Sequence, residues 1–107
     1  MKPAVVCAGA VLLSWAMAAT AAGDSEAGKA KSTPCRTCHG KDGRGTMDQF
    51  PNLAGQSAFY LSKQLKDFRK GTRPDEIMSV IAKPLSDQDI EDLAAYYANL
   101  KPACECQ

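Results

Sequence analysis

The chain has 107 residues, and its 13 lysines and arginines nearly balance its 12 aspartates and glutamates, for a formal net charge of +1. That length accommodates one domain rather than two. The near-neutral charge excludes general electrostatic capture of nucleic acid, which needs a basic excess to displace counterions. Hydrophobic residues make up 45% of the chain, too many for a disordered tail. Five cysteines in so short a chain indicate covalent or metal chemistry.

Residues 1–22 have the pattern of a secretory signal peptide. Lys2 is followed by an apolar run over residues 4–19, and small residues then precede a cleavage site after Ala21 or Ala22. The alternative is a transmembrane anchor, but the run is shorter than the ~20 residues that span a bilayer, and no basic stop follows it. We therefore expect export to the periplasm and no integral membrane segment after processing.

The domain expected over residues 23–101 begins with a short helix and a long loop. Asp24 or Ser25 can cap a helix that runs through Ala30, and Thr33-Pro34 then closes or bends it. Residues 39–56 are rich in Gly, Asp, Asn and Pro. A structureless stretch of that length in a small domain is usually a functional loop wrapped around something.

Helical spacing returns after this loop. A helix is predicted from a cap at Ser57 to a stop at Gly71, a short helical turn over residues 75–83, and a last helix from a capping box at Ser86 to an end at Pro102. No alternating pattern of a strand is present, so the predicted class is all-α. The apolar faces of the two longer helices are Tyr60, Leu61, Leu65 and Phe68, and Ile90, Leu93, Ala94, Tyr97 and Leu100.

The chemistry lies in the pentad Cys35-Arg36-Thr37-Cys38-His39, which has the attachment pattern of a c-type haem. Two thiols one helical turn apart can each add to a haem vinyl group, and the histidine that follows can then ligate the iron. Covalent attachment also lets a small chain use the macrocycle as its core, which relieves the shortage of buried surface in a domain of this size. The pentad therefore predicts one covalently attached haem c.

Two other readings of the cysteines remain open. Cys35 and Cys38 can form a redox dithiol, although the chain lacks the βαβ pattern that would support one. Together with Cys104 and Cys106 they can also form a four-cysteine zinc site. Sulfurs in an exported protein are more often oxidised than metal-bound, which disfavours zinc.

A haem iron bound by His39 needs a sixth ligand or a vacancy, and there is no second histidine. Met47 follows His39 after only eight residues, whereas Met78 lies beyond a complete predicted helix that can carry the chain around the macrocycle edge. Met78 is therefore the predicted distal ligand, and the alternative is that it is an ordinary core methionine. A thioether ligand favours ferrous iron and raises the reduction potential relative to two histidines.

These motifs together resemble the class I cytochromes c, specifically the small periplasmic bacterial type that also forms each half of dihaem cytochromes. The resemblance implies a cytochrome c fold of three to four helices around one haem, with the first and last helices crossing. It extends from about Asp24 to Leu100. The segments that carry it are 35–40, 50–56, 60–65, 68–73 and 85–89.

The resemblance also implies roles for individual residues. Pro51 matches the proline whose carbonyl accepts the N–H of the proximal histidine, a contact that would fix the imidazole ring and raise its basicity. Gly28 matches the small residue where the first and last helices cross, with Tyr96 or Tyr97 packed at the crossing. Met78 matches the distal ligand of the family.

The tail, residues 102–107, departs from the family pattern because it carries Cys104 and Cys106. An internal disulfide between them would close a small strained ring. The pair can instead link to a partner or a second copy, bind a soft metal, or stay free, and a frayed terminus without function is the alternative. A disulfide-linked partner or dimer is one expectation that follows.

Charge is unevenly placed along the domain. A basic cluster precedes an acidic one, and such separation can steer weak redox partners or can be no more than solvated helix faces. The basic cluster is Lys63, Lys66, Arg69, Lys70, Arg73 and Lys83, and the acidic one is Asp87, Asp89, Glu91 and Asp92.

The function that these features predict is one-electron transfer between redox protein partners, without bond chemistry and hence without enzyme activity. The alternative is a haem c subunit of a periplasmic dehydrogenase or oxidase, which a covalent anchor through the tail would favour. A third reading is a ligand-binding or sensing haem, which needs a labile bond from Met78.

Overall fold

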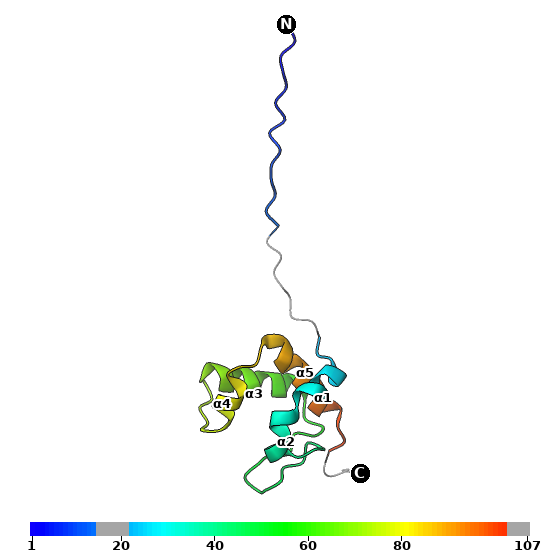
Figure 1. Cartoon of the computed structure of the whole chain (residues 1–107), viewed down its shortest axis with the longest axis vertical. Helices are drawn as coiled ribbons and strands as arrows, with labels where there is room; N and C mark the ends of the chain where they lie inside the picture. Colours follow the sequence, from blue (N-terminus) through cyan, green and yellow to red (C-terminus); the bar gives the residue numbers. More distant parts are fainter. Residues whose placement is uncertain (15–21, 103–107) are drawn as a thin grey trace.

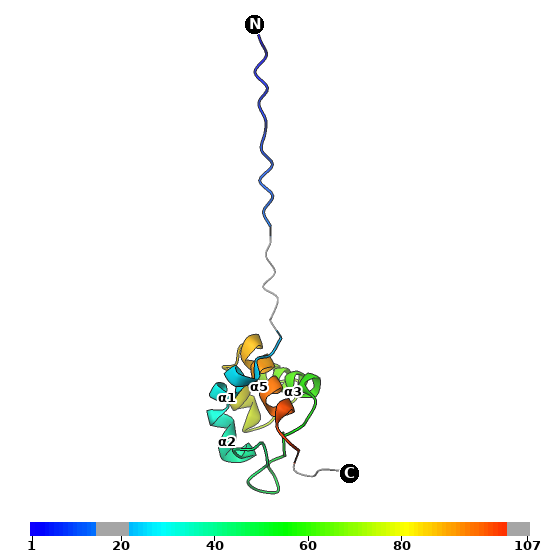
Figure 2. The same ribbon diagram turned by 90° about the vertical axis from the view of Figure 1, so that its right-hand side faces the viewer.

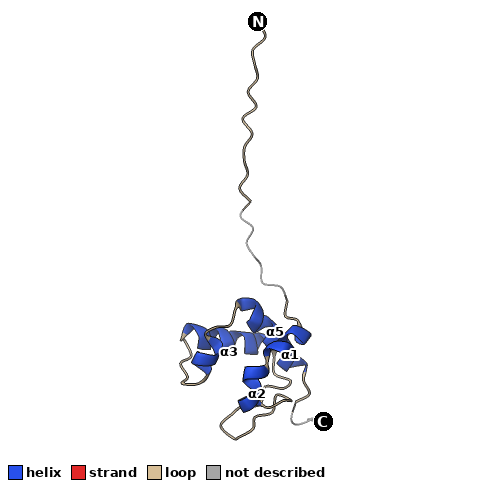
Figure 3. Ribbon diagram, viewed as in Figure 1, coloured by secondary structure: helices blue, strands red, loops and turns tan. Residues whose placement is uncertain are grey.

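The computed structural model describes residues 1–14 and 22–102, and within these ranges it contains helices and no strands (Figures 1 and 3). Residues 1–14 are exposed and have no regular secondary structure. The helices are α1 (Ser25–Lys31), α2 (Thr33–His39), α3 (Ala58–Lys70), α4 (Met78–Ala82) and α5 (Asp87–Asn99). No helix among the described residues is long and apolar enough to cross a membrane. The all-α prediction is confirmed.

The described ranges hold five helices rather than the three or four expected, because the predicted break at Thr33-Pro34 starts a second helix. Asp24 caps α1 by accepting the N–H groups of Glu26 and Ala27. Pro34 lies in the first turn of α2, where its missing N–H is not needed by the helix. Thr33-Pro34 therefore bends the chain instead of ending its helical course.

The next two helices begin and end close to the predicted positions, with two differences. Ser57 caps α3 through the Tyr60 N–H, and Gly71 ends it with a left-handed φ of 88°. Tyr60, expected on the apolar face, is 46% exposed, whereas Leu61 and Phe68 are buried. The helical turn predicted over residues 75–83 is the shorter α4, and the Asp75 side chain accepts the N–H groups of Ile77 and Met78 at its start.

The last helix has the predicted cap and core face. Ser86 accepts the Asp89 N–H, and the Asp89 carboxylate accepts the Ser86 N–H, so the capping box is present. The helix ends at Asn99, two residues before the Lys101-Pro102 pair, and Leu100 is half-buried beyond it. The four other predicted core positions of α5 are all buried: Ile90, Leu93, Ala94 and Tyr97.

Helices α1 and α5 cross at close range, as expected (Figure 2). A β-carbon on Gly28 would lie only 2.0 Å from the Asp92 carbonyl oxygen and 2.7 Å from the Tyr96 β-carbon. Any larger side chain would push the helices apart, so glycine is required here. Of the two tyrosines proposed for this crossing, Tyr96 is the one that packs on Gly28.

A buried carboxylate fastens the same crossing. Asp92 accepts hydrogen bonds from the Asp24 N–H (2.9 Å), Lys31 Nζ (2.6 Å) and Gln88 Nε2 (2.9 Å). These bonds, led by the Asp24 N–H and Lys31, lower the pKa of Asp92 to about 2. The start of α1 is thereby tied to the middle of α5 through a charged group that has donors on several sides.

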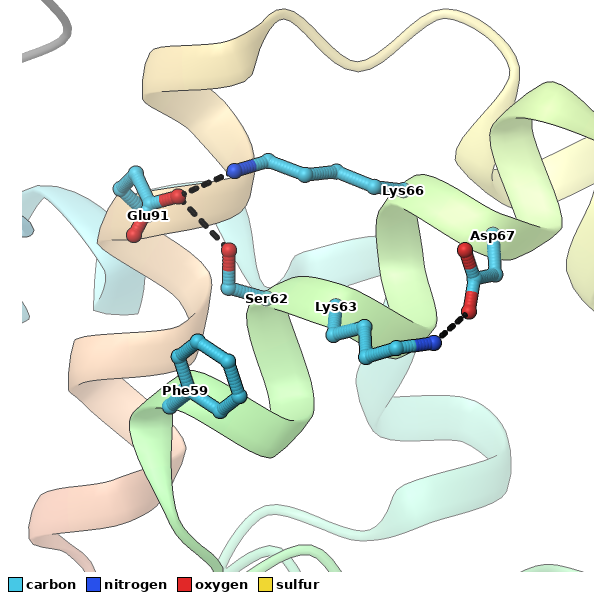
Figure 4. Close-up of a pocket in the computed structure, with 6 residues that line it drawn as sticks. All are labelled: Phe59, Ser62, Lys63, Lys66, Asp67 and Glu91. Carbon is cyan, nitrogen blue, oxygen red and sulfur yellow. Dashed lines mark hydrogen bonds and ion pairs between the residues drawn. The ribbon is translucent and has the colours of Figure 1, made fainter.

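The basic and acidic clusters meet at the contact between α3 and α5. Lys66 Nζ lies 2.7 Å from Glu91 Oε1 (Figure 4). Arg69 pairs with Asp87 at 2.5 Å. The Lys66 ammonium is the first cause of the lowered pKa of Glu91. These four charges, which looked separated in the sequence, therefore satisfy one another within the domain instead of forming two opposed surfaces.

Candidate haem site

Helix α2 presents the two cysteines of the pentad one turn apart. Cys35 and Cys38 are half-buried and neither is in a disulfide. Cys35 packs against the core formed by Leu93, Tyr97 and their neighbours, and this burial raises the pKa of its thiol. A catalytic dithiol needs a lowered thiol pKa, so the environment of Cys35 disfavours that alternative.

His39, the last residue of α2, is buried and held by one backbone oxygen. Its Nδ1 lies 2.8 Å from the Pro51 carbonyl oxygen, twelve residues further along the chain. With the proton on Nδ1 donated to that oxygen, Nε2 keeps its lone pair for a metal. This is the contact that the resemblance implied for these two residues.

The loop between α2 and α3 returns to His39 through backbone hydrogen bonds. The Gly43 carbonyl accepts the N–H groups of Leu53 (2.7 Å) and Ala54 (3.0 Å), and the Thr46 N–H donates to the Cys38 carbonyl at 2.9 Å. Gly43 has a φ of 72°, a left-handed conformation that glycine adopts without strain. A turn built this way brings residue 51 back over the end of α2.

One further hydrogen bond and one packing contact support the same loop. Asn52 Oδ1 accepts the Gly45 N–H at 2.7 Å. The position of a β-carbon on Gly43 is 3.1 Å from Tyr97 Cδ1, so the loop packs directly on α5. The histidine side of the site is therefore anchored to the main core.

The Tyr97 hydroxyl is the one buried side-chain polar atom without a hydrogen-bond partner among the described residues. Tyr97 is only 3% exposed, and its pKa is raised by burial and by the neighbouring Cys35. Tyr96 and the Arg36 charge also lie near enough to affect this pKa. A wall formed mainly by the apolar core beside Cys35 fits an apolar macrocycle better than it fits a hydrated metal ion.

The two candidate distal ligands lie on different segments. Met78 is the first residue of α4, half-buried, and α4 packs against α3. Met47 is exposed in the loop that follows α2, where its sulfur lies 3.7 Å from Gln49 Nε2. Ile77 and Val80 on either side of Met78 are also exposed, so α4 has apolar surface left for a large apolar group to cover.

The donor set fits haem c. Two thiols one turn apart and one imidazole with a free Nε2 match the needs of covalent attachment and axial ligation. Among residues 1–14 and 22–102 no three His, Cys, Asp or Glu side chains are grouped to hold a metal ion. The four-cysteine zinc alternative would need Cys104 and Cys106, which lie outside the described residues.

A shallow groove between α3 and α5 is a separate feature (Figure 4). Glu91 Oε1 accepts from both Lys66 Nζ and Ser62 Oγ, at 2.7 and 2.6 Å. Lys63 is paired with Asp67. The polar side chains of this groove already bond to one another, and all of its lining residues come from α3 and α5, so it contains neither the cysteines nor the histidine of α2.

The sequence model of the family described as Cytochrome c matches residues 25–101, which covers both the pentad and α5. The chain belongs to the cytochrome c family. Its helical architecture is also found in the crystal structure of reduced recombinant cytochrome c4 from Pseudomonas stutzeri, with a TM-score of 0.71 and 45% sequence identity over 75% of this chain and 47% of that one. The cofactor of this family is haem c.

Two relatives differ in how much of their length the chain covers. The chain is 47% identical over 92 residues to cytochrome c4 of Stutzerimonas stutzeri, a match of 78% of this chain and 44% of the relative. It is 47% identical over 81 residues to cytochrome c-554(548) of Halomonas halodenitrificans, a match of 73% of this chain and 98% of the relative. The chain thus spans less than half of the cytochrome c4 relative and nearly all of the shorter cytochrome.

A third relative carries a functional name. The thiosulfate dehydrogenase electron acceptor of Stutzerimonas stutzeri is 46% identical over 69 residues, which are 62% of this chain and 32% of that protein. Like the cytochrome c4 relative, it is much longer than the segment that matches.

The structure brings Cys35, Cys38, His39 and Pro51 together around the end of α2 and leaves Met78 on a separate element. Sequence reasoning missed two side chains that the fold places against the predicted site residues. Tyr97 was assigned to the core without its contact with Cys35, which only the fold reveals. Asp75, three residues before Met78, had a local signal, because aspartate at that spacing commonly bonds the first amides of a helix.

Proposed function

We propose that this chain is a one-electron carrier with a single haem c. Cys35 and Cys38 hold the haem through thioethers, His39 ligates the iron through Nε2, and Met78 completes the coordination. The observation that carries the proposal is the bond from His39 Nδ1 to the Pro51 carbonyl oxygen at 2.8 Å, because it leaves only Nε2 to face a metal. The sequence contains one such pentad and one histidine, which supports one haem per chain.

The protein's contribution is to hold the two axial ligands with little movement. The Pro51 carbonyl fixes the imidazole ring and raises its basicity, and the Met78 thioether favours the reduced metal. Haem c bound between them supplies an iron that alternates between ferric and ferrous states. Two protein ligands leave no open position for a substrate, which supports electron transfer over catalysis.

The names of the relatives support the same role and the same kind of partner. The relatives described above are named as cytochromes or as an electron acceptor, which favours redox proteins as partners. The alternative of a haem subunit in a periplasmic dehydrogenase or oxidase is not favoured, since the relatives at 47% identity are named as cytochromes. The paired charges of α3 and α5 also indicate that a partner recognises some other surface.

The proposed domain organisation follows the sequence pattern. Residues 1–22 direct export and are removed, residues 23–101 form the haem domain in the periplasm, and residues 102–107 form a tail. Gly23 packs on α5, where a β-carbon would lie 2.1 Å from the Glu91 carbonyl oxygen, which supports a mature chain that still contains Gly23. Cys104 and Cys106 lie outside the described residues, so a disulfide-linked dimer or partner stays a prediction.

Acid–organic extraction and quantification of the matured protein test the haem proposal. The colour is expected to stay with the protein, at one haem per chain, and stepwise potentiometric titration is expected to show one single-electron transition. Free haem in the extract would overturn covalent attachment. Turnover of a small-molecule substrate by the isolated protein would overturn the carrier role in favour of an enzyme.

A further inference from the structure

The side chain of Asp75 bonds to the start of α4, and Asp75 is not among the residues predicted to bind the haem. Asp75 Oδ1 accepts the Met78 N–H at 2.7 Å and the Ile77 N–H at 2.9 Å. In return, the Asp75 N–H donates to Ser79 Oγ at 3.0 Å, and the Ser79 N–H donates to the Asp75 carbonyl oxygen at 3.2 Å. The amide of Met78 is thus held directly by the Asp75 side chain.

The hydrogen bonds from Asp75 should contribute more to the stability of α4 than such bonds contribute to a longer helix. Helix α4 has five residues, too few to be stable through its own hydrogen bonds. The chain reaches it from Gly71 through a stretch without regular helix or strand. Arg73, the charged residue nearest in sequence before Asp75, bonds to Gln64 Oε1 and lies over the Phe68 ring, while its charge also acts on Asp75. The hydrogen bonds of the Asp75 carboxylate go to the amides of Ile77 and Met78.

We propose that Asp75 is a positioning residue that fixes the backbone of Met78 and thereby sets how firmly the distal thioether holds the iron. This inference rests on the proposed role of Met78 as distal ligand. A backbone free to move would spend more time with the sulfur away from the metal, and an external ligand competes for the position left open. The strength of the cap should therefore be visible in the binding of an external ligand.

The test compares holoprotein variants of two aspartates. Asp75→Ala removes the acceptor, Asp75→Asn keeps an oxygen at the same position, and Asp67→Ala is the matched control, because Asp67 bonds to Lys63 and Thr72 and not to α4. Apparent cyanide affinity of the ferric protein is expected to rise about three- to tenfold in Asp75→Ala, from the usual strength of a helix cap. The methionine–iron charge-transfer band should weaken in the same variant. Asp75→Asn and Asp67→Ala should bind cyanide like the parent.

The possible failures point to different conclusions. If Asp75→Ala keeps the cyanide affinity and band of the parent while Met78→Ala loses the band, Asp75 does not position the ligand and the inference is overturned. If Met78→Ala keeps the band, the ligand assignment itself has failed. Should Asp75→Ala fold poorly, as judged by circular dichroism, Ser79→Ala removes the reciprocal bond more gently. It should raise cyanide affinity by a smaller factor, and an unchanged affinity there would also count against the inference.

Discussion

The two sides of the proposed haem site are built in different ways. The proximal segment, residues 33–56, carries both cysteines and His39, and its backbone bonds to itself repeatedly and packs on Tyr97 of α5. The distal segment, residues 71–83, carries Met78 on a short helix that packs on α3 and is held by the bonds of one exposed aspartate. The proposed proximal ligand, His39, is therefore fixed by the core of the domain, and the proposed distal ligand, Met78, by local contacts that are easier to weaken.

Replacing Met78, the proposed distal ligand, should have the largest effect of the changes that distinguish the two sides of the site. Met78→Ala is expected to open the iron, abolish the ferric methionine–iron band, lower the reduction potential and admit cyanide or carbon monoxide readily, because the soft thioether is lost. Visible spectroscopy and potentiometry measure these changes. Met47→Ala is the control and should change none of them. The reverse pattern would move the ligand to Met47.

Two glycines with similar backbone conformations provide the next test. Gly43 on the proximal segment has a φ of 72° and close neighbours, whereas Gly71 at the start of the distal segment has a φ of 88° and nothing within 4 Å of where a β-carbon would lie. Gly43→Ala is expected to lower the free energy of unfolding by about 2–4 kcal/mol, from backbone strain and crowding together. Gly71→Ala should lower it by about 1–2 kcal/mol from strain alone. Equal losses in denaturant titrations would contradict the proposed difference between the segments.

Acid should weaken the α1–α5 crossing that supports the proximal side. The pKa of Asp92 is lowered to about 2 in the folded protein, below the ordinary value of 3.8. The unfolded chain therefore takes up the proton first, and the stability that this group provides above about pH 4 is lost as the pH falls toward 2. Asp92→Asn should lower the free energy of unfolding at pH 7 by about 1–3 kcal/mol, since buried hydrogen bonds are lost.

Denaturant unfolding measured between pH 2 and pH 6 checks this prediction. The parent should lose stability on acidification, and Asp92→Asn should show a flatter profile over that range. Asp67→Asn is the matched control, because Asp67 also has a lowered pKa, through its hydrogen bond with Lys63, but lies at the surface of α3. Its profile should stay close to that of the parent, since solvent screens an exposed ion pair. A pH profile of Asp92→Asn as steep as that of the parent would show that another group dominates.

The smallest effect is expected at the hydroxyl beside Cys35. Tyr97→Phe removes a buried hydroxyl that has no partner among the described residues, so the free energy of unfolding should change by less than about 0.5 kcal/mol. The matched comparison is Tyr96→Phe, because the hydroxyl of Tyr96 lies 3.5 Å from the Lys41 carbonyl oxygen. A loss above about 1 kcal/mol in Tyr97→Phe would show that the hydroxyl gains a partner when haem is bound.

Helix ends were predicted correctly from the sequence where one side chain bonds a nearby backbone N–H group or a glycine ends the helix. Ser57 and Ser86 cap helices as predicted, Asp24 is the cap of the two candidates Asp24 and Ser25, and Gly71 ends a helix. The separate helix α2 was missed, because proline reads equally as a stop and as a first-turn residue. Tyr60 was placed in the core because helical spacing defines a face but not how wide the buried part of that face is.

Contacts between distant segments could not be read in the same way. Asp87, Glu91 and the basic residues of α3 looked like separated charges until the two helices lay side by side and paired them. The partner of Gly28 was left open between two adjacent tyrosines, and the fold places Tyr96 against Gly28 and Tyr97 against Gly43. Successive residues on a helix are about 100° apart, so an uncertain rotation changes which of them faces the crossing.

The sequence alone determined the attachment motif of the proposed proximal side, because the spacing of Cys35, Cys38 and His39 on one helical turn depends on adjacent residues only. It also determined where most helices begin and end, since caps and glycine stops act within a few residues. The resemblance implied that the Pro51 carbonyl reaches His39, and the tertiary structure contains that contact. Only the tertiary structure decided that Tyr97 lies beside Cys35 and that Asp92 joins α1 to α5. Those contacts join residues far apart in the chain, and they form only once burial of the core has fixed how the helices pack.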